Sequence, residues 1–297
     1  MGRLGIFIER TTVASSDEMN ALMRLSQVAR KMGHRADFLF RPDIFKIPEY
    51  DAIFIRALTD PLNAAYVASR TADLYGVRVI DDPESIVICC DKVNMYRRLI
   101  DSEVPIPPTV FVESGGINLQ RGAELIDLLG SPVVLKAPNS SFSRYVDRAA
   151  SPEEFVRIGK RFSRRADLIV AQRFVRSEFD WRVGTLGGEP LYVCQYTFAR
   201  KQWKIHAYTS QGRSLFGPVR GIPMEKADPR LIEVALQASA AIGRGLYGVD
   251  LKQVEDDYVV IEVNDNPTII AGDEDQQAGQ LYGRLVEFLL NPPRVEP

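Results

Sequence analysis

The most informative segment of this chain is GVDLKQVEDDYVVIEVNDNP, residues 248–267. Two runs rich in valine and isoleucine, 247–253 and 258–263, flank an acidic turn, and this pattern predicts two short paired strands. Glu262 and Asn264 stand two positions apart on the second strand, so their side chains point to the same face. An otherwise core-like strand therefore carries two polar side chains side by side.

Asp250, on the first strand, can lie opposite this pair. Two carboxylates and a carboxamide are oxygen donors of the kind that Mg²⁺ prefers. Two simpler interpretations stay open: the acidic side chains face solvent, or Asn264 serves only the turn formed by Asn-Asp-Asn-Pro. Against the first, Glu262 interrupts an apolar run, where a charge is costly to bury without a partner. The hairpin is a candidate metal site.

Composition excludes several classes of protein. The chain has 297 residues, 45% of them hydrophobic, with 37 Lys plus Arg against 39 Asp plus Glu. This size supports a large core in two or three lobes, and the balanced charge predicts neither nucleic acid nor a membrane as a partner. No apolar run approaches the roughly 20 residues of a membrane span, and the N-terminus is charged too early for a signal peptide. We expect a soluble, cytoplasmic protein.

The cysteines and histidines provide few candidates for a metal site or a catalytic triad. The three cysteines, Cys89, Cys90 and Cys194, lack CxxC spacing, so we expect reduced thiols. Only two histidines are present, which leaves little material for a zinc site or a histidine-centred triad.

Strands alternate with helices over the first hundred residues, which predicts a small parallel α/β lobe. The expected strands are 4–9, 36–40, 51–57 and 77–81, and the expected helices are 16–32, 60–75 and 83–102. The first strand is followed by ERTTVASSDE and not by GxGxxG, which argues against a Rossmann cofactor site. The proline-rich VPIPP, 104–108, is typical of a linker.

The middle of the chain offers candidate phosphate ligands. The buried-type strand PVVLK, 132–136, ends in Lys136 and precedes a serine-rich loop. An ammonium beside several hydroxyl groups can bind phosphate oxygens. Alternatively, Lys136 extends to solvent and the loop is an ordinary turn. The strand 167–172 follows, and beyond it Glu178 and Asp180 could accept hydrogen bonds from a ribose.

The last third is predicted to be an antiparallel sheet. Strands 180–186 and 191–196 flank Gly-Gly-Glu-Pro, and helix 228–243 precedes the carboxylate hairpin. Between them lies a basic and aromatic segment that either faces an anionic substrate or is a solvated loop; it contains Arg200, Lys201, Trp203 and Lys204.

In combination these motifs resemble the ATP-grasp superfamily. The resemblance rests on Lys92 in its Asp-Lys pair, Lys136 after PVVL, then QRFV, DWRVGTLGG, GVD and IEVNDNP in order. It is greatest to the RimK-type glutamate ligases that modify a ribosomal protein, and to glutathione-synthetase-like carboxylate–amine ligases, over about residues 91–290. It implies an α/β (α+β) ATP-grasp fold with lobes 1–103, 104–175 and 176–297, the latter two clasping ATP.

The resemblance also implies a role for individual positions. The residues that would bind ATP are Lys92, Lys136, Ser140, Ser141, Ser143, Gln172, Arg173, Val175, Glu178 and Asp180. Those that would bind Mg²⁺ or Mn²⁺ are Asp250, Glu262 and Asn264, and Arg182 is placed at the reacting phosphate. Lys204, from the basic and aromatic segment, is a second candidate catalytic residue. The chain departs from the family in its glycine-free loop NSSFSR, in Arg173 where many relatives have glutamate, and in the segment NPTIIAGDEDQ after the metal ligands.

The implied reaction forms an amide or peptide bond. A carboxylate attacks the γ-phosphate of ATP, and an amine captures the resulting acyl phosphate, releasing ADP and phosphate. The substrates would be a small-molecule or peptide carboxylate and an amine, and the family suggests a possible homo-oligomer. Two alternatives remain: another ATP-dependent phosphoryl transfer, or a non-catalytic nucleotide-binding module.

Overall fold

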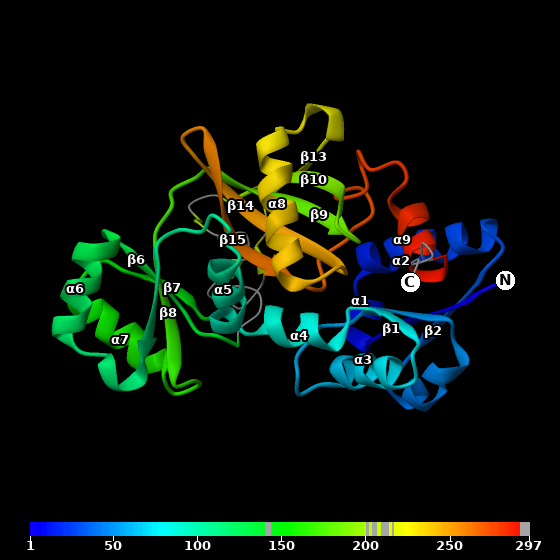
Figure 1. Cartoon of the computed structure of the whole chain (residues 1–297), viewed down its shortest axis with the longest axis horizontal. Helices are drawn as coiled ribbons and strands as arrows, with labels where there is room; N and C mark the ends of the chain where they lie inside the picture. The colour runs from blue at the N-terminus through cyan, green and yellow to red at the C-terminus, as the bar shows by residue number, and fades with distance from the viewer. Residues whose placement is uncertain (140–143, 200–201, 204–206, 209–213, 216, 292–297) are drawn as a thin grey trace.

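The structure is a computed structural model that describes residues 1–139, 144–199, 202–203, 207–208, 214–215 and 217–291. Ser140, Ser141, Ser143 and Lys204 lie outside the described residues, so their predicted roles stay predictions. Figure 1 shows an elongated molecule in which the elements of the two ends of the long axis flank a central sheet.

The N-terminal sheet is parallel, as the alternation of strands and helices predicts, with the order β2-β1-β3-β4. Its strands are β1 Arg3–Ile8, β2 Arg35–Leu39, β3 Ala52–Arg56 and β4 Arg78–Ile80. The helices of this part are α1 Arg10–Ala14, α2 Ser16–Lys31, the 3₁₀ helix η1 Arg41–Glu49, and α3 Ala64–Leu74. Helix α3 begins later than predicted, because the Asn63 side chain caps it by accepting from the backbone N–H groups of Ala65 and Tyr66.

Residues 83–102 form two helices, where the sequence predicted one. Helix α4 spans Pro83–Cys90 and α5 spans Lys92–Asp101. Asp91 separates them because its side chain accepts from the N–H groups of Val93 and Asn94 and starts a new helix. The break makes Lys92 the first residue of α5.

The middle sheet has the order β5-β8-β6-β7, and its neighbouring strands are antiparallel. Its elements are β5 Thr109–Glu113, the 3₁₀ helix η2 Ser114–Gly116, α6 Leu119–Leu129, β6 Val133–Lys136, β7 Val146–Ala149, α7 Pro152–Phe162 and β8 Leu168–Arg173. The two α-helices pack against each other and on the sheet around a separate hydrophobic core that includes Phe155 and Phe162.

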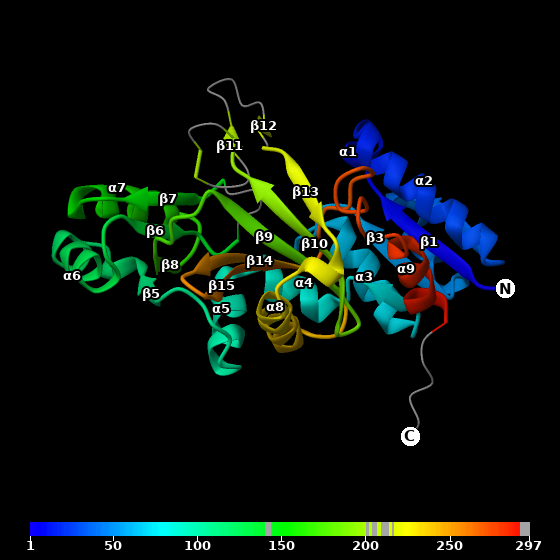
Figure 2. The same cartoon turned by 90° about the horizontal axis from the view of Figure 1, so that it is seen from above.

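The central sheet has the order β13-β10-β9-β14-β15, and it is antiparallel as expected. Its elements are β9 Phe179–Leu186, β10 Glu189–Thr197, β13 Val219–Ile222, the 3₁₀ helix η3 Met224–Lys226, α8 Pro229–Ile242, β14 Leu246–Val254 and β15 Asp257–Asn264. The short strands β11 Ala207–Tyr208 and β12 Ser214–Leu215 form a separate ribbon beside it (Figure 2).

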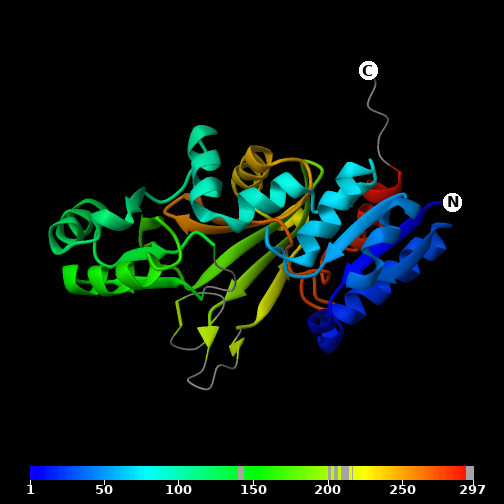
Figure 3. The ribbon, with the colours of Figure 1, turned by 90° about the horizontal axis from the view of Figure 1, so that it is seen from below.

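The last helix, α9 Leu281–Leu290, returns to the start of the chain and packs against α2 (Figures 1 and 3). Helix α5, which follows the N-terminal sheet in the chain, packs against α8 on the central sheet. Elements on both sides of residue 103 are therefore packed together, although the three-lobe division itself stays a prediction. None of the described helices is long and apolar enough to cross a membrane.

Candidate active site

A cavity of about 430 Å³ is lined by residues from all three major sheets and from the junction of α4 and α5. Of the site residues predicted from the sequence, its lining includes Lys92, Lys136, Gln172, Arg173, Val175, Asp180, Arg182, Asp250, Glu262 and Asn264. Glu178 is the predicted residue that the structure describes but places elsewhere: it is exposed and lines a neighbouring hollow with Trp203. Its assignment to the ribose stays a prediction.

The carboxylate hairpin forms as predicted. Strands β14 and β15 pair with Asp250 opposite Glu262 and Gly248 opposite Asn264. Asp250 is only 5% exposed, so the interpretation that places its side chain in solvent is wrong for it. Asn264 Nδ2 lies 3.2 Å from Asp250 Oδ2, so all three candidate metal ligands converge at one end of the hairpin.

Arg182 binds one of these carboxylates directly. It stands opposite Asp250 on the neighbouring strand β9, and its Nε and Nη2 donate to the two carboxylate oxygens at 2.7 and 2.8 Å. Burial disfavours the guanidinium charge, but Asp250 outweighs that cost and raises the pKa of Arg182 well above its ordinary value. The guanidinium also lies 4.6 Å above the ring of Tyr196, which fixes its plane.

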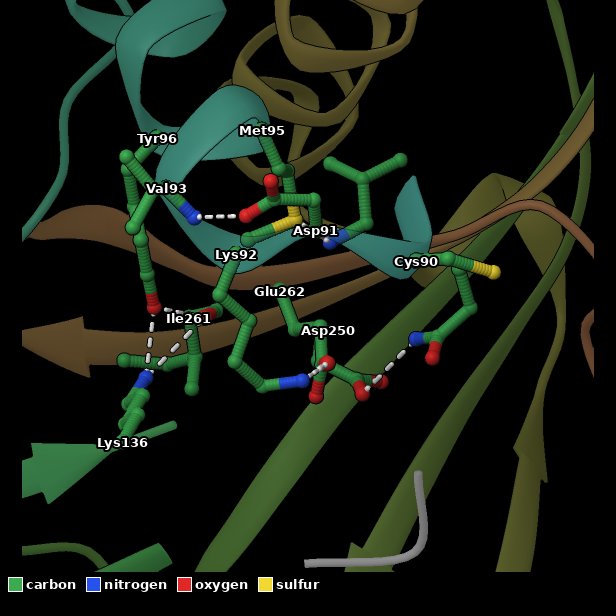
Figure 4. A network of polar contacts seen from close by, with 12 residues as sticks. Cys90, Asp91, Lys92, Val93, Met95, Tyr96, Lys136, Asp250, Ile261 and Glu262 are labelled. Atoms are coloured by element: carbon green, nitrogen blue, oxygen red, sulfur yellow. Dashed lines mark hydrogen bonds and ion pairs between the residues drawn. The ribbon is translucent and has the colours of Figure 1, made fainter. Parts of the chain in front are cut away.

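Lys92 forms the second ion pair of the site (Figure 4). Its Nζ lies 2.7 Å from Glu262 Oε1, and the lysine side chain is only 4% exposed. Burial tends to raise the pKa of Glu262, but the charge and hydrogen bond of Lys92 outweigh it and hold that pKa below its usual value. The break at Asp91 makes Lys92 the first residue of α5, and the Lys92 side chain reaches Glu262 on the carboxylate hairpin.

Lys136 is buried as well, which shows that the interpretation as a solvent-facing strand end is wrong. Its Nζ donates to the hydroxyl of Tyr96 and to the carbonyl of Ile261, and it lies 5.0 Å from the Tyr96 ring centroid (Figure 4). Burial, offset in part by Glu262, lowers the pKa of Lys136 to about 8. A buried ammonium in an open cavity with neutral hydrogen-bond partners is suited to an anionic ligand.

Lys252 and Asp180 form a third buried ion pair in the cavity. Lys252 Nζ donates to Asp180 and to Ser177, and its ammonium lies 4.7 Å from the Phe198 ring centroid. Burial raises the pKa of Asp180 to about 6 despite this partner. The sequence interpretation missed Lys252, although its position two residues after Asp250 places both side chains on the same face of β14.

The end of β8 and the linker before β5 are joined by hydrogen bonds. Gln172 is buried, and its side chain donates to Thr109 and accepts from the Tyr96 hydroxyl. The backbone N–H of Arg173 donates to Pro108, while its guanidinium reaches the Leu129 carbonyl. Tyr96 thus connects Gln172 to Lys136, a role that the sequence did not indicate because it depends on a contact between α5 and the middle sheet.

The donor set suits Mg²⁺ or Mn²⁺. Two carboxylates and a carboxamide converge, and each carboxylate is paired with a cationic side chain of the protein. Across the part of the chain that the structure describes, no group of three or more His, Cys, Asp and Glu residues is arranged for a metal. A small oxygen-donor site of this kind is usual for Mg²⁺ that also takes phosphate and water ligands.

Comparisons with known proteins agree with this geometry. No protein-family model matches the chain. It is 24% identical over 229 residues to the glutamate–LysW ligase ArgX of Sulfolobus acidocaldarius, covering 73% of this chain and 74% of that one. It is 23% identical over 269 residues to a probable alpha-L-glutamate ligase of Haemophilus influenzae, covering 82% and 86%.

The fold is also found among solved structures. The chain matches an ATP-grasp RimK domain protein from Sphaerobacter thermophilus with a TM-score of 0.66 and 18% identity, covering 97% of this chain and all of that one. The sequence relatives and the shared fold therefore support an ATP-grasp ligase similar to the RimK type, an enzyme of ATP-dependent carbon–nitrogen bond formation.

Proposed function

We propose that this ATP-dependent carboxylate–amine ligase makes its acyl phosphate in the cavity between Lys136, Arg182 and the hairpin of Asp250 and Glu262. The observation that carries the proposal is the convergence of these cations and carboxylates, which come from separate elements, on a single cavity. Phosphoryl transfer requires positioning and neutralisation of charge more than covalent chemistry by the protein.

Lys92 and Lys136 would bind the phosphates of ATP, and Asp250, Glu262 and Asn264 would hold Mg²⁺. When bound, the metal supplies neutralisation of the phosphate charge. Lys136 supports this assignment because it is buried beside neutral oxygens and its lowered pKa recovers when an anion binds. Arg182 faces the same cavity and would stabilise the charge that develops on the transferred phosphoryl group.

A covalent protein intermediate has little support from the described cysteines. Cys89 and Cys194 are buried, and burial raises the pKa of Cys89 well above its ordinary value and that of Cys194 to about 12. Cys90 is partly exposed and lines the cavity, but burial raises the pKa of its thiol as well. Thiols held protonated in this way are poor nucleophiles. Direct attack of the substrate carboxylate on ATP therefore accounts better for the site than a thioester route does.

The amine substrate that we propose to test first is L-glutamate, because the sequence relatives are named glutamate ligases. The carboxylate partner would be a small molecule or a peptide. We expect the enzyme to act in the cytoplasm, and the family resemblance suggests a homo-oligomer.

The test is the release of ADP and phosphate from ATP and Mg²⁺ across a panel of carboxylates, with and without L-glutamate, together with mass spectrometry of the products. Glu262→Ala should abolish amide formation, because it removes both a metal ligand and the partner of Lys92. Glu84→Ala is the matched control, since Glu84 forms an exposed ion pair with Arg98 away from the cavity. ATP binding without turnover on any substrate would instead favour the binding module, and phosphorylated product without amine incorporation would favour a phosphotransferase.

A further inference from the structure

Arg56 is a cation of the cavity to which the proposed phosphoryl transfer assigns no role. It is the last residue of β3 and lies at the carboxyl edge of the parallel sheet, the edge at which α/β sheets commonly bind ligands. It is 8% exposed and lines the same cavity as the metal hairpin. The sequence interpretation assigned it no role.

The partners of Arg56 are uncharged, like those of Lys136, and differ from those of three other cations of the cavity. Lys92, Arg182 and Lys252 each pair with a carboxylate. Arg56 Nη1 donates instead to two uncharged oxygens, Asn266 Oδ1 at 2.6 Å and the Pro267 carbonyl at 2.9 Å.

No carboxylate of the described residues forms an ion pair with Arg56, and its Nε and Nη2 make no hydrogen bond to those residues. A largely desolvated guanidinium of this kind gains from an anionic ligand.

Asp81 is an acidic residue whose pKa responds to Arg56, but it does not replace such a ligand. Asp81 is only 2% exposed, and burial together with Asp265 raises the pKa of Asp81 well above its ordinary value, although Arg56 acts in the opposite direction. The raised pKa favours the uncharged acid. Neither oxygen of the Asp81 carboxyl has a hydrogen-bond partner, so this group does not hold the guanidinium.

Arg56 is fixed next to the metal hairpin. Asn266 accepts from Arg56 and donates to the Ala57 carbonyl at 2.6 Å, so these bonds tie the segment that follows β15 to the end of β3. Asn264 lies only two residues before this clamp. The guanidinium is therefore held at the end of the cavity formed by the N-terminal sheet, while Lys136 comes from the middle sheet.

We propose that Arg56 binds a carboxylate of the amine substrate, separate from the reacting amine, and selects for substrates that carry one. A guanidinium with two nitrogens to offer is suited to a carboxylate, which it can bind through paired hydrogen bonds. The phosphates of ATP already have their own cations in Lys92 and Lys136. The inference rests on the proposed ligase function. It adds the chemical class of the amine substrate, one that carries a carboxylate, and the residue that recognises this carboxylate.

The experiment compares the binding of L-glutamate with that of its two monoamides, L-glutamine and L-isoglutamine, to the full chain in the presence of ADP and Mg²⁺. Calorimetry on the wild type should show that one of the amides binds about 10- to 100-fold more weakly than L-glutamate, the size expected for a charged hydrogen bond. Arg56→Gln should reduce that ratio to below about threefold, and Arg56→Lys should give an intermediate value. The affinity for ADP should stay unchanged in both variants.

Arg78→Gln is the matched control. Arg78 also belongs to the N-terminal sheet, also donates to a backbone carbonyl, that of Phe288, and also lies over a phenylalanine ring, at 4.8 Å compared with 5.4 Å for Arg56 over Phe54. It does not line the cavity, so its variant should keep the full preference for L-glutamate.

Three results would overturn the inference: a wild type that does not distinguish L-glutamate from either amide, an Arg56→Gln protein that keeps the wild-type ratio, or a loss of ADP affinity as large as the loss of glutamate affinity. These outcomes are separate from the ligase assay. A wild type that forms amide from L-glutamate while Arg56→Gln keeps the preference leaves the ligase and removes the role of Arg56. A preference that depends on Arg56, without any amide product, would keep the role of Arg56 and remove the ligase function.

Discussion

Replacing Lys92 with methionine should tighten the binding of Mn²⁺ to the nucleotide-free protein, although Lys92 is a proposed ligand of ATP. Its ammonium lies 2.7 Å from Glu262 and so occupies a candidate metal ligand when no metal is present. A divalent cation must displace Lys92 and tolerate its charge. Methionine keeps most of the length and apolar contact of the side chain and removes only the competing charge.

The size of the effect follows from the geometry of the pair. Opposite unit charges about 4 Å apart attract by about 4 kcal/mol at the effective dielectric constant of a protein surface. The Glu262 side chain is 31% exposed, so solvent screens part of this attraction. A gain of about 1–3 kcal/mol remains, which corresponds to a dissociation constant roughly 5- to 150-fold lower.

The assay is electron paramagnetic resonance of free Mn²⁺ during titration of the nucleotide-free protein. Lys136→Met is the matched control and should have a smaller effect, because the Lys136 ammonium contacts the Tyr96 hydroxyl and the Ile261 carbonyl and no carboxylate. In the presence of ATP the Lys92 variant should bind nucleotide more weakly than the wild type. Unchanged or weaker Mn²⁺ binding by the nucleotide-free variant would refute the competition between Lys92 and the metal.

Three further changes test the buried charges. Lys136→Met should stabilise the nucleotide-free protein by about 1–3 kcal/mol at pH 7 in urea unfolding, because burial lowers the pKa of Lys136 to about 8 and so penalises its charged form. The gain should shrink between pH 8 and about 10.4, where the wild-type lysine is neutral when folded but still protonated when unfolded, and a gain that is independent of pH would contradict this. Asp250→Asn should destabilise the protein by about 3–5 kcal/mol in the same assay, since it leaves the Arg182 guanidinium buried without its carboxylate, and a loss below about 1 kcal/mol would show that solvent reaches this pair. Tyr196→Phe should cost about 1–3 kcal/mol, because it removes the donor to the buried Glu274 carboxylate, and an unchanged midpoint of unfolding would argue against that bond.

Local sequence patterns predicted most of the framework. The alternation of strands and helices was sufficient to predict the parallel N-terminal sheet. The two-residue spacing of Glu262 and Asn264 was sufficient to predict that both side chains lie on one face of the hairpin. The division of 83–102 into two helices had a local signal that the interpretation missed, since Asp91 is a good N-cap residue.

The remaining features depend on contacts between distant segments, which periodicity does not report. Lys136 has the sequence context of a solvent-facing strand end, and only the approach of Tyr96 from α5 buries it. The ion pair of Lys252 with Asp180 joins residues 72 positions apart in the chain, and Arg56 meets Asn266 across 210 positions. Lys136 had an ordinary surface interpretation, and Lys252 and Arg56 had no assigned role, because only the fold shows that these charges are removed from water.

The most direct test of the proposed acyl phosphate follows oxygen atoms. A carboxylate substrate labelled with oxygen-18 is incubated with the enzyme, ATP, Mg²⁺ and the amine, and the released phosphate is analysed by mass spectrometry. Attack of the carboxylate on the γ-phosphate predicts that one labelled oxygen reaches inorganic phosphate for each amide formed, and that Glu262→Ala abolishes both. Label found in AMP, or amide formed with unlabelled phosphate, would contradict the proposed mechanism.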